Sequence, residues 1–445
     1  MTSIILFVKL CLAILIVWVA CYFRTPLLAS VRLWAFWGLV LLSVGLLLTE
    51  IPKLKIGTRA SEKGKNGQII ISWAIATLTA FGLASAATSE VKFNLTKQTV
   101  LNQDHSQLGN LGQHFIIGYR NFDEIKQLVE KRAIGGVFIT ARNIKNKTKA
   151  EIQQEIQTLQ AIRTSQKLSP LWIATDQEGG IVSRLSPPLT KLPQLSAIIE
   201  QQKTLAQKKA QVMRYASIHG QELSELGVNL NFAPVVDLNK GIINPKDKFS
   251  QIYRRAISAD KDIVAQVALW YCQTLETYQV KCTLKHFPGL GRVNADTHLE
   301  HAELKNSVQE LSQDDWVPFR EVMSKSGAFT MLGHAKLTAI DAHTPVSFSQ
   351  PVITGIIRQQ WQHNGILITD DFSMEAVHGS PDRIEKATVK ALNAGVDLIL
   401  ISYDKDLYYP AIAALLKAKA AGHLVSATLV NSSQRLEQAK LKMEN

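Results

Sequence analysis

Apolar residues follow two different patterns along this 445-residue chain. Residues 4–23, 33–49 and 69–87 form three runs of mostly apolar side chains, and roughly 17 to 20 such residues are enough for a helix to cross a bilayer. A buried core helix is the alternative for each run, but three of them near one end would be unusual in a soluble domain. We therefore predict that residues 1–98 form a membrane anchor with three transmembrane helices.

From about residue 100 onward, short β-rich apolar runs alternate with longer segments of helical period. This alternation is typical of repeated βα units and a parallel sheet. The expected strands are 114–119, 136–140, 171–176, 229–236, 282–286, 328–334, 366–370 and 397–401. The expected helices include 123–132, 149–165, 205–226, 260–278, 314–325, 352–363 and 383–394. Eight such units predict an α/β fold in which residues 99–445 form a single (β/α)8 TIM-type barrel.

Several chemically active side chains fall at or just after the ends of these predicted strands. In a barrel of this kind, catalytic groups come from the carboxyl ends of the strands and from the loops that follow them. The side chains found there are Asp176, Asp237, Lys285, His286, His334 and Asp370. Because they would share one mouth of the barrel, we predict that the active site lies at that mouth.

The loops of the anchor predict its orientation. The segment 50–68 carries five basic side chains, whereas the first loop holds only Arg24 and Arg32. The five are Lys53, Lys55, Arg59, Lys63 and Lys65. A loop rich in Lys and Arg stays in the cytoplasm, so three crossings place the barrel on the periplasmic, or extracytoplasmic, side of the inner (plasma) membrane. Lys9 interrupts the first run, and we expect its amine to reach the membrane interface.

The net charge of +12 reflects mainly the anchor. Ten Lys and Arg against three Glu give residues 1–98 a charge of +7, which leaves only +5 for the other 347 residues. Nucleic-acid-binding proteins interleave basic and aromatic residues, and this chain does not. The basic residues therefore indicate topology and affinity for anionic lipid, and we expect no nucleic-acid partner.

Small residues and cysteines raise two further questions. The sequence Ala-Ser-Ala-Ala at 84–87 has the spacing of a signal-peptidase site, and cleavage after Ala86 would release the barrel, although two preceding spans favour a retained anchor. Cys11 and Cys21 lie within the first run. Cys272 and Cys282 lie in the barrel and could pair in an oxidising compartment, but a buried free thiol is the commoner state and the one we expect.

Five ordered motifs resemble those of the family 3 glycoside hydrolases, and specifically their β-N-acetylglucosaminidase (β-N-acetylhexosaminidase) branch from bacterial cell-wall recycling. They are Asp-Gln-Glu-Gly-Gly at 176–180, Asn-Phe-Ala-Pro-Val-Val-Asp at 231–237, Lys-His-Phe-Pro-Gly at 285–289, Asp-Thr-His at 296–298 and Thr-Asp-Asp-Phe-Ser-Met at 369–374. Because five ordered motifs match between residues 176 and 374, the resemblance is specific, unlike the lone Gly-Leu-Gly at 289–291, which does not indicate a phosphate loop.

The resemblance implies a retaining mechanism with Asp370 as nucleophile and His298 as acid and base, held by Asp296. A carboxylate can form and release a glycosyl ester while a second group protonates the leaving oxygen. Imidazole suits proton transfer in both directions near neutral pH. Asp371 is an alternative nucleophile, but the family motif places the nucleophile first. A histidine also repels phosphate less than a carboxylate does, so phosphorolysis is a minor alternative.

The resemblance also implies a set of substrate-binding side chains that grip the sugar hydroxyls and the N-acetyl-bearing ring. They are Asp176, Arg184, Arg255, Lys285 and His286. A purely structural role is the alternative for His286, for His334 and for Asp237. The family's Gly-His-Gly is replaced here by Gly289-Leu290-Gly291 followed by Arg292, so the contacts of the loop that carries His298 are expected to differ.

Together these features predict a membrane-anchored enzyme that removes terminal, non-reducing β-linked N-acetylglucosamine from peptidoglycan fragments or related oligosaccharides. No cluster of metal-ligand spacing and no nucleotide fingerprint is present, so no cofactor or metal is expected. The sequence leaves the natural substrate and the oligomeric state open. The alternatives are a membrane-tethered, non-catalytic carbohydrate-binding protein and a β-glucosidase of the same superfamily.

Overall fold

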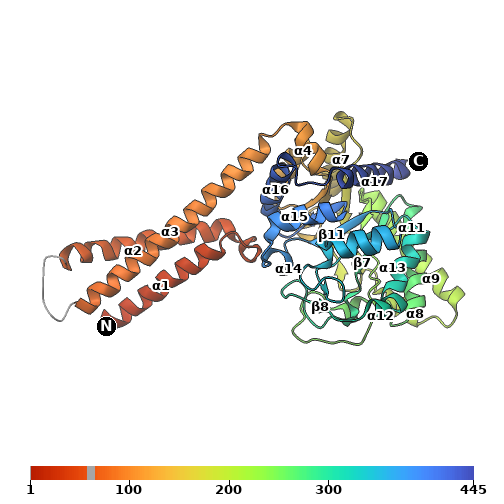
Figure 1. Ribbon diagram of the computed structural model, residues 1–445, viewed down its shortest axis with the longest axis horizontal. Coiled ribbons are helices and arrows are strands. Elements are labelled where there is room, and N and C mark those ends of the chain that lie inside the picture. The colour runs from red at the N-terminus through yellow and green to blue at the C-terminus, as the bar shows by residue number, and fades with distance from the viewer. Residues whose placement is uncertain (1, 58–65, 445) are drawn as a thin grey trace. The chain divides into compact units, whose positions relative to one another are not determined.

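The computed structural model describes residues 2–57 and 66–444 of the chain. The chain divides into two compact units, Met1–Thr99 and Val100–Asn445. Figure 1 shows long helices in the first unit and a barrel of strands surrounded by helices in the second.

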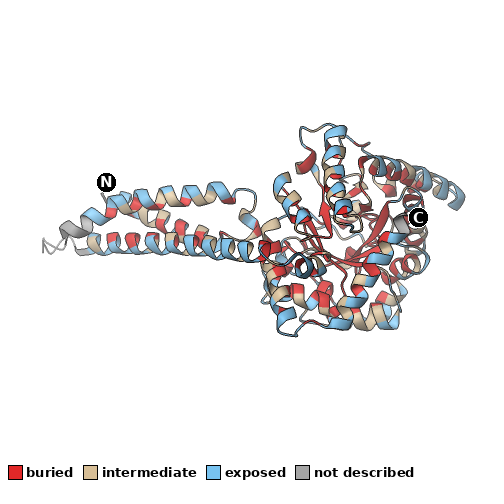
Figure 2. Cartoon of the chain, turned by 90° about the horizontal axis from the view of Figure 1, so that it is seen from above, coloured by how far each residue is buried: buried red, intermediate tan, exposed pale blue. Residues whose placement is uncertain are grey.

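The N-terminal unit consists of three long helices, as predicted. They are α1 (Thr2–Tyr22), α2 (Arg32–Gly57) and α3 (Asn66–Leu101), and a short 3-10 turn, η1 (Pro26–Leu28), joins the first two. Within the described residues, three stretches are long and apolar enough to cross a membrane, namely Ile4–Tyr22, Arg32–Pro52 and Gly67–Leu101. Many of their apolar side chains are exposed within the unit (Figure 2), as a lipid-facing surface requires.

Small side chains allow the three helices to pack closely. Ile16, Ala20, Leu39 and Ala86 are buried in one cluster that all three helices contribute to. A Cβ atom on Gly82 would lie 2.7 Å from Ile16 Cγ2, so only glycine permits this approach of α3 to α1. The Ala-Ser-Ala-Ala sequence that resembles a peptidase site is helical throughout, and Ala86 is fully buried. Proteases cleave exposed and irregular segments, whereas residues 84–87 lie inside α3; whether the chain is cleaved there stays a prediction.

Lys9 forms an ion pair between α1 and α2, and its expected place at a membrane interface stays a prediction. Its Nζ donates to Glu50 Oε1 at 2.7 Å and to Thr49 Oγ1 at 2.8 Å, and the Glu50 side chain is fully buried. An ion pair between helices replaces the water that the amine would otherwise need. Glu50, predicted in the loop, therefore belongs to α2, which continues to Gly57.

The basic segment that predicts the orientation lies mostly outside the described residues. Arg59, Lys63 and Lys65 fall in the gap between α2 and α3, while Lys53 and Lys55 belong to the last turns of α2. The orientation therefore remains a prediction.

The second unit contains the predicted closed barrel of eight parallel strands. The strands are β1 (Phe115–Gly118), β2 (Gly136–Phe138), β3 (Trp172–Thr175), β6 (Leu230–Asn231), β7 (Lys281–Phe287), β9 (Phe329–Leu332), β11 (Leu367–Asp371) and β12 (Leu398–Ile401). Each pairs with its sequence neighbours around the ring, and β1 closes it by pairing with β12. Each observed strand overlaps its predicted range, and the (β/α)8 prediction is confirmed.

Helices surround this barrel. The longer ones are α4 (His105–Gly112), α5 (Phe122–Glu130), α7 (Lys149–Ser165), α9 (Leu205–Leu226), α11 (Lys261–Glu276), α13 (Trp316–Lys325), the π-helix η4 (Pro351–Gln360), α15 (Arg383–Ala394), α16 (Tyr408–Ala420) and α17 (Ser426–Glu444). Local sequence determines where several of them begin and end. The hydroxyl of Thr148 and the carboxylate of Glu151 form a capping box on α7, and Gly227 ends α9 at a φ of 92°, a conformation that favours glycine.

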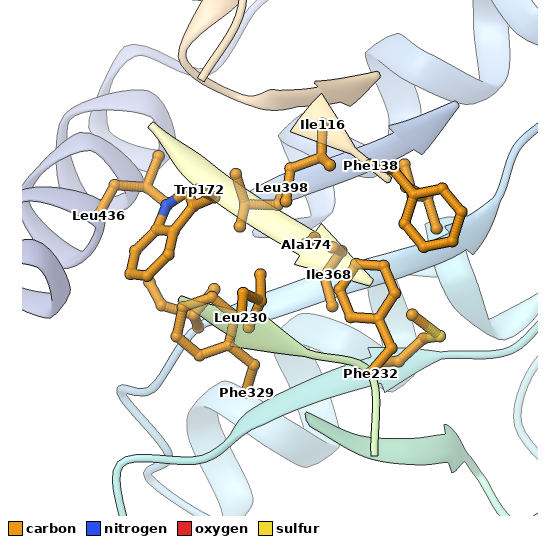
Figure 3. Packing of buried hydrophobic residues seen from close by; sticks show 13 residues of the cluster. Ile116, Phe138, Trp172, Ala174, Leu230, Phe232, Phe329, Ile368, Leu398 and Leu436 are labelled. Atoms are coloured by element: carbon orange, nitrogen blue, oxygen red, sulfur yellow. The ribbon is translucent and has the colours of Figure 1, made fainter. Parts of the chain in front are cut away.

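Large side chains fill the interior of the barrel (Figure 3). The Trp172 and Phe329 rings meet edge to face at 5.0 Å, and the Phe138 and Phe232 rings stack at 5.6 Å. Leu436 from α17 joins the same buried cluster. Because the barrel is packed through its middle, a ligand can reach the strand ends only at a mouth.

Cys272 of α11 and Cys282 of β7 form a disulfide bond, with a Cα–Cα distance of 5.3 Å. The expectation of a buried free thiol is therefore wrong. The helix α11 packs directly on β7, which brings two side chains ten residues apart into bonding range. Both cysteines are buried.

Candidate active site

Four of the predicted site residues lie at the carboxyl ends of three barrel strands. Asp176 follows β3 directly, Lys285 and His286 lie near the end of β7, and Asp370 lies at the end of β11. The pairing register of β7 shifts between Leu284 and Phe287, and that of β11 shifts between Ile368 and Asp371. Such irregularities change the direction in which side chains point from the strand. Here they fall at Lys285, His286 and Asp370.

A buried cluster of two cations and two carboxylates forms one side of the site. Lys285 Nζ lies 2.7 Å from Asp176 Oδ1 and 2.6 Å from Glu178 Oε1. Arg255 holds the same Glu178 through two bonds, Nε to Oε2 at 3.0 Å and Nη2 to Oε1 at 2.7 Å. Burial opposes ionisation of Glu178, but Arg255 and Lys285 hold the pKa of its carboxyl well below the ordinary value.

Glu178 is a member of this cluster that the sequence reasoning did not select. Its side chain is only 6% exposed, and it contacts both predicted cationic residues, Arg255 and Lys285. The signal was present, since Glu178 lies within the Asp-Gln-Glu-Gly-Gly motif. An acid two residues after a strand end points to the same mouth as Asp176, and that argument would have found it.

Asp237 holds His286 in place. The Asp237 carboxylate is fully buried and lies 2.7 Å from His286 Nδ1 through Oδ2. It also accepts the backbone N–H of His286 at 3.1 Å and that of Leu290 at 2.7 Å. Nδ1 of His286 is therefore the protonated nitrogen, and Nε2 lies 3.5 Å from Arg255 Nη2. The sequence left the role of Asp237 undecided. In the structure its carboxylate holds His286, a predicted binding residue.

His334 has the contacts of a core histidine. It is 1% exposed, its Nδ1 lies 2.7 Å from Ser347 Oγ, and its Nε2 lies 3.0 Å from the Asp371 carbonyl oxygen. Burial lowers its pKa, against the opposing effect of Asp370. Both nitrogens are therefore engaged, and His334 joins Ser347 to the backbone at the end of β11.

The adjacent aspartates at the end of β11 have different surroundings. Asp371 accepts backbone N–H groups of Ser373, Ser402 and Tyr403, and also the Ser402 hydroxyl. Within the described part of the chain, the Asp370 carboxylate accepts one bond, from its neighbour's N–H to Oδ1 at 2.8 Å. Asp371 therefore anchors the loops that follow β11 and β12. Asp370 keeps its Oδ2 available for a ligand.

The electrostatic environment of Asp370 favours its charged form. Burial alone would raise the pKa of its carboxyl, but the charges of His286, His334 and His298, in that order, hold the pKa below its ordinary value. The N–H of Asp371 adds to the effect. A carboxylate that stays ionised beside three histidines is able to act as a nucleophile.

Asp296 and His298 form a pair in the loop after β7. His298 Nδ1 lies 3.2 Å from Asp296 Oδ1, and the His298 N–H donates to the same oxygen at 3.1 Å. Ser250 Oγ donates to Asp296 Oδ1 at 3.2 Å and lies 3.3 Å from His298 Nδ1. Burial opposes ionisation of Asp296, but the bonds and charge of His298 lower its pKa to about 2. Ser250, a second partner of the imidazole, was missed because no motif includes it.

The loop that carries His298 meets the loop that follows Asp370. The N–H of Glu375, at the start of α14 (Glu375–His378), donates to the His298 carbonyl oxygen at 3.2 Å. The charge of His298 also acts on Asp370. The structure therefore brings the predicted nucleophile and the predicted acid to one mouth, and the His298 side chain is 39% exposed there.

Arg184 is the one predicted binding residue whose side chain is not joined to the cluster. Its backbone N–H donates to the Asp176 carbonyl oxygen at 3.0 Å, but the residue is exposed and its guanidinium has no hydrogen bond or ion pair among the described residues. Arg184 is thus near Asp176 in the fold, with its guanidinium directed to solvent.

The two departures from the family pattern, Leu290 and Arg292, help to anchor the loop that carries His298. Leu290 is buried against Ile252, Ala256 and Ala335. Arg292 bonds Asp315 Oδ2 through Nε at 2.7 Å and contacts Asp314 and Glu310 as well. The base of the loop is therefore held by an apolar contact and by ion pairs.

In residues 2–57 and 66–444, no three His, Cys, Asp or Glu side chains are grouped to hold a metal ion.

Comparison with known proteins agrees with this geometry. Residues 101–439 match the glycosyl hydrolase family 3 N-terminal domain. The chain is 32% identical over 295 residues to a β-hexosaminidase of Neisseria meningitidis serogroup C, covering 66% of this chain and 78% of that protein. It is 30% identical over 295 residues to β-hexosaminidase A of Pseudoalteromonas piscicida, covering 62% of this chain and 47% of that protein.

A solved structure is also similar. The family 3 β-N-acetylglucosaminidase from Paenibacillus sp. str. FPU-7 superposes with a TM-score of 0.69 and 28% identity, over 76% of this chain and 62% of that one. The chain thus spans about half the length of the Pseudoalteromonas protein and under two thirds of the Paenibacillus protein.

Proposed function

Because the chain belongs to glycoside hydrolase family 3, we propose that it is a retaining β-N-acetylhexosaminidase that removes terminal, non-reducing β-linked N-acetylglucosamine. Its substrates are peptidoglycan fragments or related oligosaccharides. The observation that carries the proposal is the contrast at the barrel mouth between the open, ionised Asp370 and the Asp296–His298 pair on the facing loop. The similar hexosaminidases support the choice of sugar.

The two groups divide the reaction between them. Asp370 attacks the anomeric carbon and forms a glycosyl ester, while His298 Nε2 gives its proton to the departing oxygen. His298 then takes a proton from the water that attacks the ester and releases Asp370. Asp296 holds Nδ1 and leaves Nε2 for this transfer. Two displacements at one carbon retain the β configuration.

The charged cluster binds the sugar so that its anomeric carbon lies next to Asp370. Asp176 and Lys285 lie at the mouth and offer a carboxylate and an ammonium group to hydroxyls. Arg255 and His286 complete this set and are held by Glu178 and by Asp237, respectively. Arg184, whose guanidinium is exposed, is free to close on a bound sugar. Such groups fix the ring so that its C1 faces the nucleophile.

An assay of the full-length chain in detergent tests the reaction. We expect a chromogenic β-N-acetylglucosaminide to be cleaved with a kcat/KM roughly 100-fold or more above that of the matching β-glucoside, because a site built for the acetamido group rejects a substrate without it. NMR of the first product should show the β anomer. A preference for the glucoside, an α product, or binding without turnover would contradict the proposal.

We further propose that residues 1–98 are a multi-pass anchor in the inner membrane and that residues 99–445 are the catalytic domain on its periplasmic side. Three apolar helices and the basic segment between the second and third support this topology. The buried Cys272–Cys282 disulfide supports it independently, since such bonds persist in oxidising compartments.

Reporter fusions test the side of the membrane. Alkaline phosphatase, which needs an oxidising compartment, should be active when fused after Asn445, whereas a green fluorescent protein exported through the same route should be dark. As the matched control, the same reporters fused within residues 58–65 should give the opposite result. Fluorescence from the fusion after Asn445 would refute the three-span topology and leave the hydrolase proposal intact.

A further inference from the structure

An exposed aromatic side chain lies beside the proposed acid and base. Phe249, in the loop between β6 and α10 (Ile252–Arg255), is 56% exposed. The centroid of its ring lies 5.6 Å from that of the His298 ring, at an interplanar angle of 45°. Single exposed apolar residues are common on protein surfaces, so the position of this one relative to the reaction decides its meaning.

The same carboxylate that holds His298 also holds Phe249. Asp296 Oδ2 accepts the backbone N–H groups of Lys248 and Phe249, each at 3.1 Å, while Oδ1 binds His298. The next residue, Ser250, bonds Asp296 through its hydroxyl at 3.2 Å. The aromatic ring and the imidazole are thus fixed to one anchor, so that Phe249 keeps its place beside the proton donor.

The chemistry of the reaction identifies what faces this ring. An acid must lie within hydrogen-bond reach of the oxygen that it protonates, and the leaving group extends from that oxygen away from the bond being cleaved. The surface around His298 therefore contacts the leaving group. Pyranose rings carry one face of C–H groups that packs on aromatic rings, and Phe249 offers an exposed apolar ring of this kind.

We propose that Phe249 forms the binding site for the sugar on the leaving-group side, by stacking against the apolar face of that pyranose ring. The inference rests on the proposed function, because it takes His298 as the acid. It predicts that the enzyme favours glycosides whose leaving group is a second sugar over those with a small alkyl group. Phe249 thereby determines specificity without taking part in the bond changes.

Two substrates separate binding of the leaving group from positioning of the acid. The β-linked disaccharide of N-acetylglucosamine and methyl β-N-acetylglucosaminide both need a proton on the departing oxygen, but only the first carries a second ring. In the full-length enzyme, Phe249→Ala should lower kcat/KM for the disaccharide about tenfold, mainly through KM, and leave the methyl glycoside and the pH profile unchanged. Phe249→Tyr should retain activity on both.

The matched control is Ile243→Ala, which removes a 64% exposed apolar side chain from the same loop and should change neither substrate. An equal loss for both substrates, or a shifted pH profile, would mean that Phe249 positions His298 and would overturn the inference. No loss on the disaccharide would overturn it too. If the wild-type enzyme cleaves neither substrate, the proposed hydrolase function itself fails.

Discussion

Asp370→Asn should reduce kcat on a β-N-acetylglucosaminide by roughly 10⁴-fold to 10⁶-fold, as the loss of a nucleophile does in other covalent mechanisms. The amide keeps the shape of the side chain and its bond from the Asp371 N–H, but it cannot attack the anomeric carbon. Thermal melting should change little, because Asp370 accepts only that one bond among the described residues. Initial rates and melting curves of the purified full-length chain measure both effects.

The control is Glu375→Gln, which neutralises an exposed carboxylate on the segment after β11 and should leave the rate unchanged. In the wild-type enzyme, the lowered pKa of Asp370 keeps this group ionised at every pH above its ordinary value of 3.8. Its protonation can therefore reduce kcat/KM only below about pH 4. An Asp370→Asn variant that keeps its turnover would reject Asp370 as the nucleophile.

The barrel could be predicted because each βα unit shows its own pattern of apolar residues within a short stretch of sequence. Each βα unit repeats an apolar strand and a helix of 3.6-residue period, so eight strands can be counted without knowing their contacts. The least accurate strand is β6, predicted as 229–236 but limited to Leu230–Asn231. Pro234 lies in this segment and has no N–H to donate. Beyond it the regular ladder is replaced by an isolated bridge between Val235 and Lys285.

Contacts between different βα repeats of the barrel could not be predicted from the sequence. The sequence left a bond between Cys272 and Cys282 as the less favoured alternative, since their pairing depends on how α11 lies on β7. Ser250 lies in no motif and meets His298 only through folding of the loop after β6. The motifs did identify Asp296 and His298, because that pair is two residues apart and forms by a local turn.

Glu178 is the clearest case of such a contact, because it links Arg255 of α10 to Lys285 of β7. All three side chains are at most 7% exposed. Together with Asp176, they balance two positive charges against two negative ones. Removing one carboxylate from such a cluster leaves a buried cation without compensation, which costs far more than the pair contributes when intact.

We therefore expect Glu178→Ala to lower the free energy of unfolding by about 3–5 kcal/mol and to raise KM, since Lys285 and Arg255 lose their common partner. Glu178→Gln should destabilise less, because an amide oxygen still accepts hydrogen bonds. The matched control is Glu225→Ala, which breaks an exposed pair of equal length, Lys149 Nζ to Glu225 Oε2 at 2.6 Å, and should have no measurable effect. Urea unfolding of the full-length protein in detergent compares the three variants. If Glu178→Ala and Glu225→Ala are equally stable, the cluster is solvated in the protein, and the account of how Lys285 and Arg255 are oriented toward the sugar is wrong.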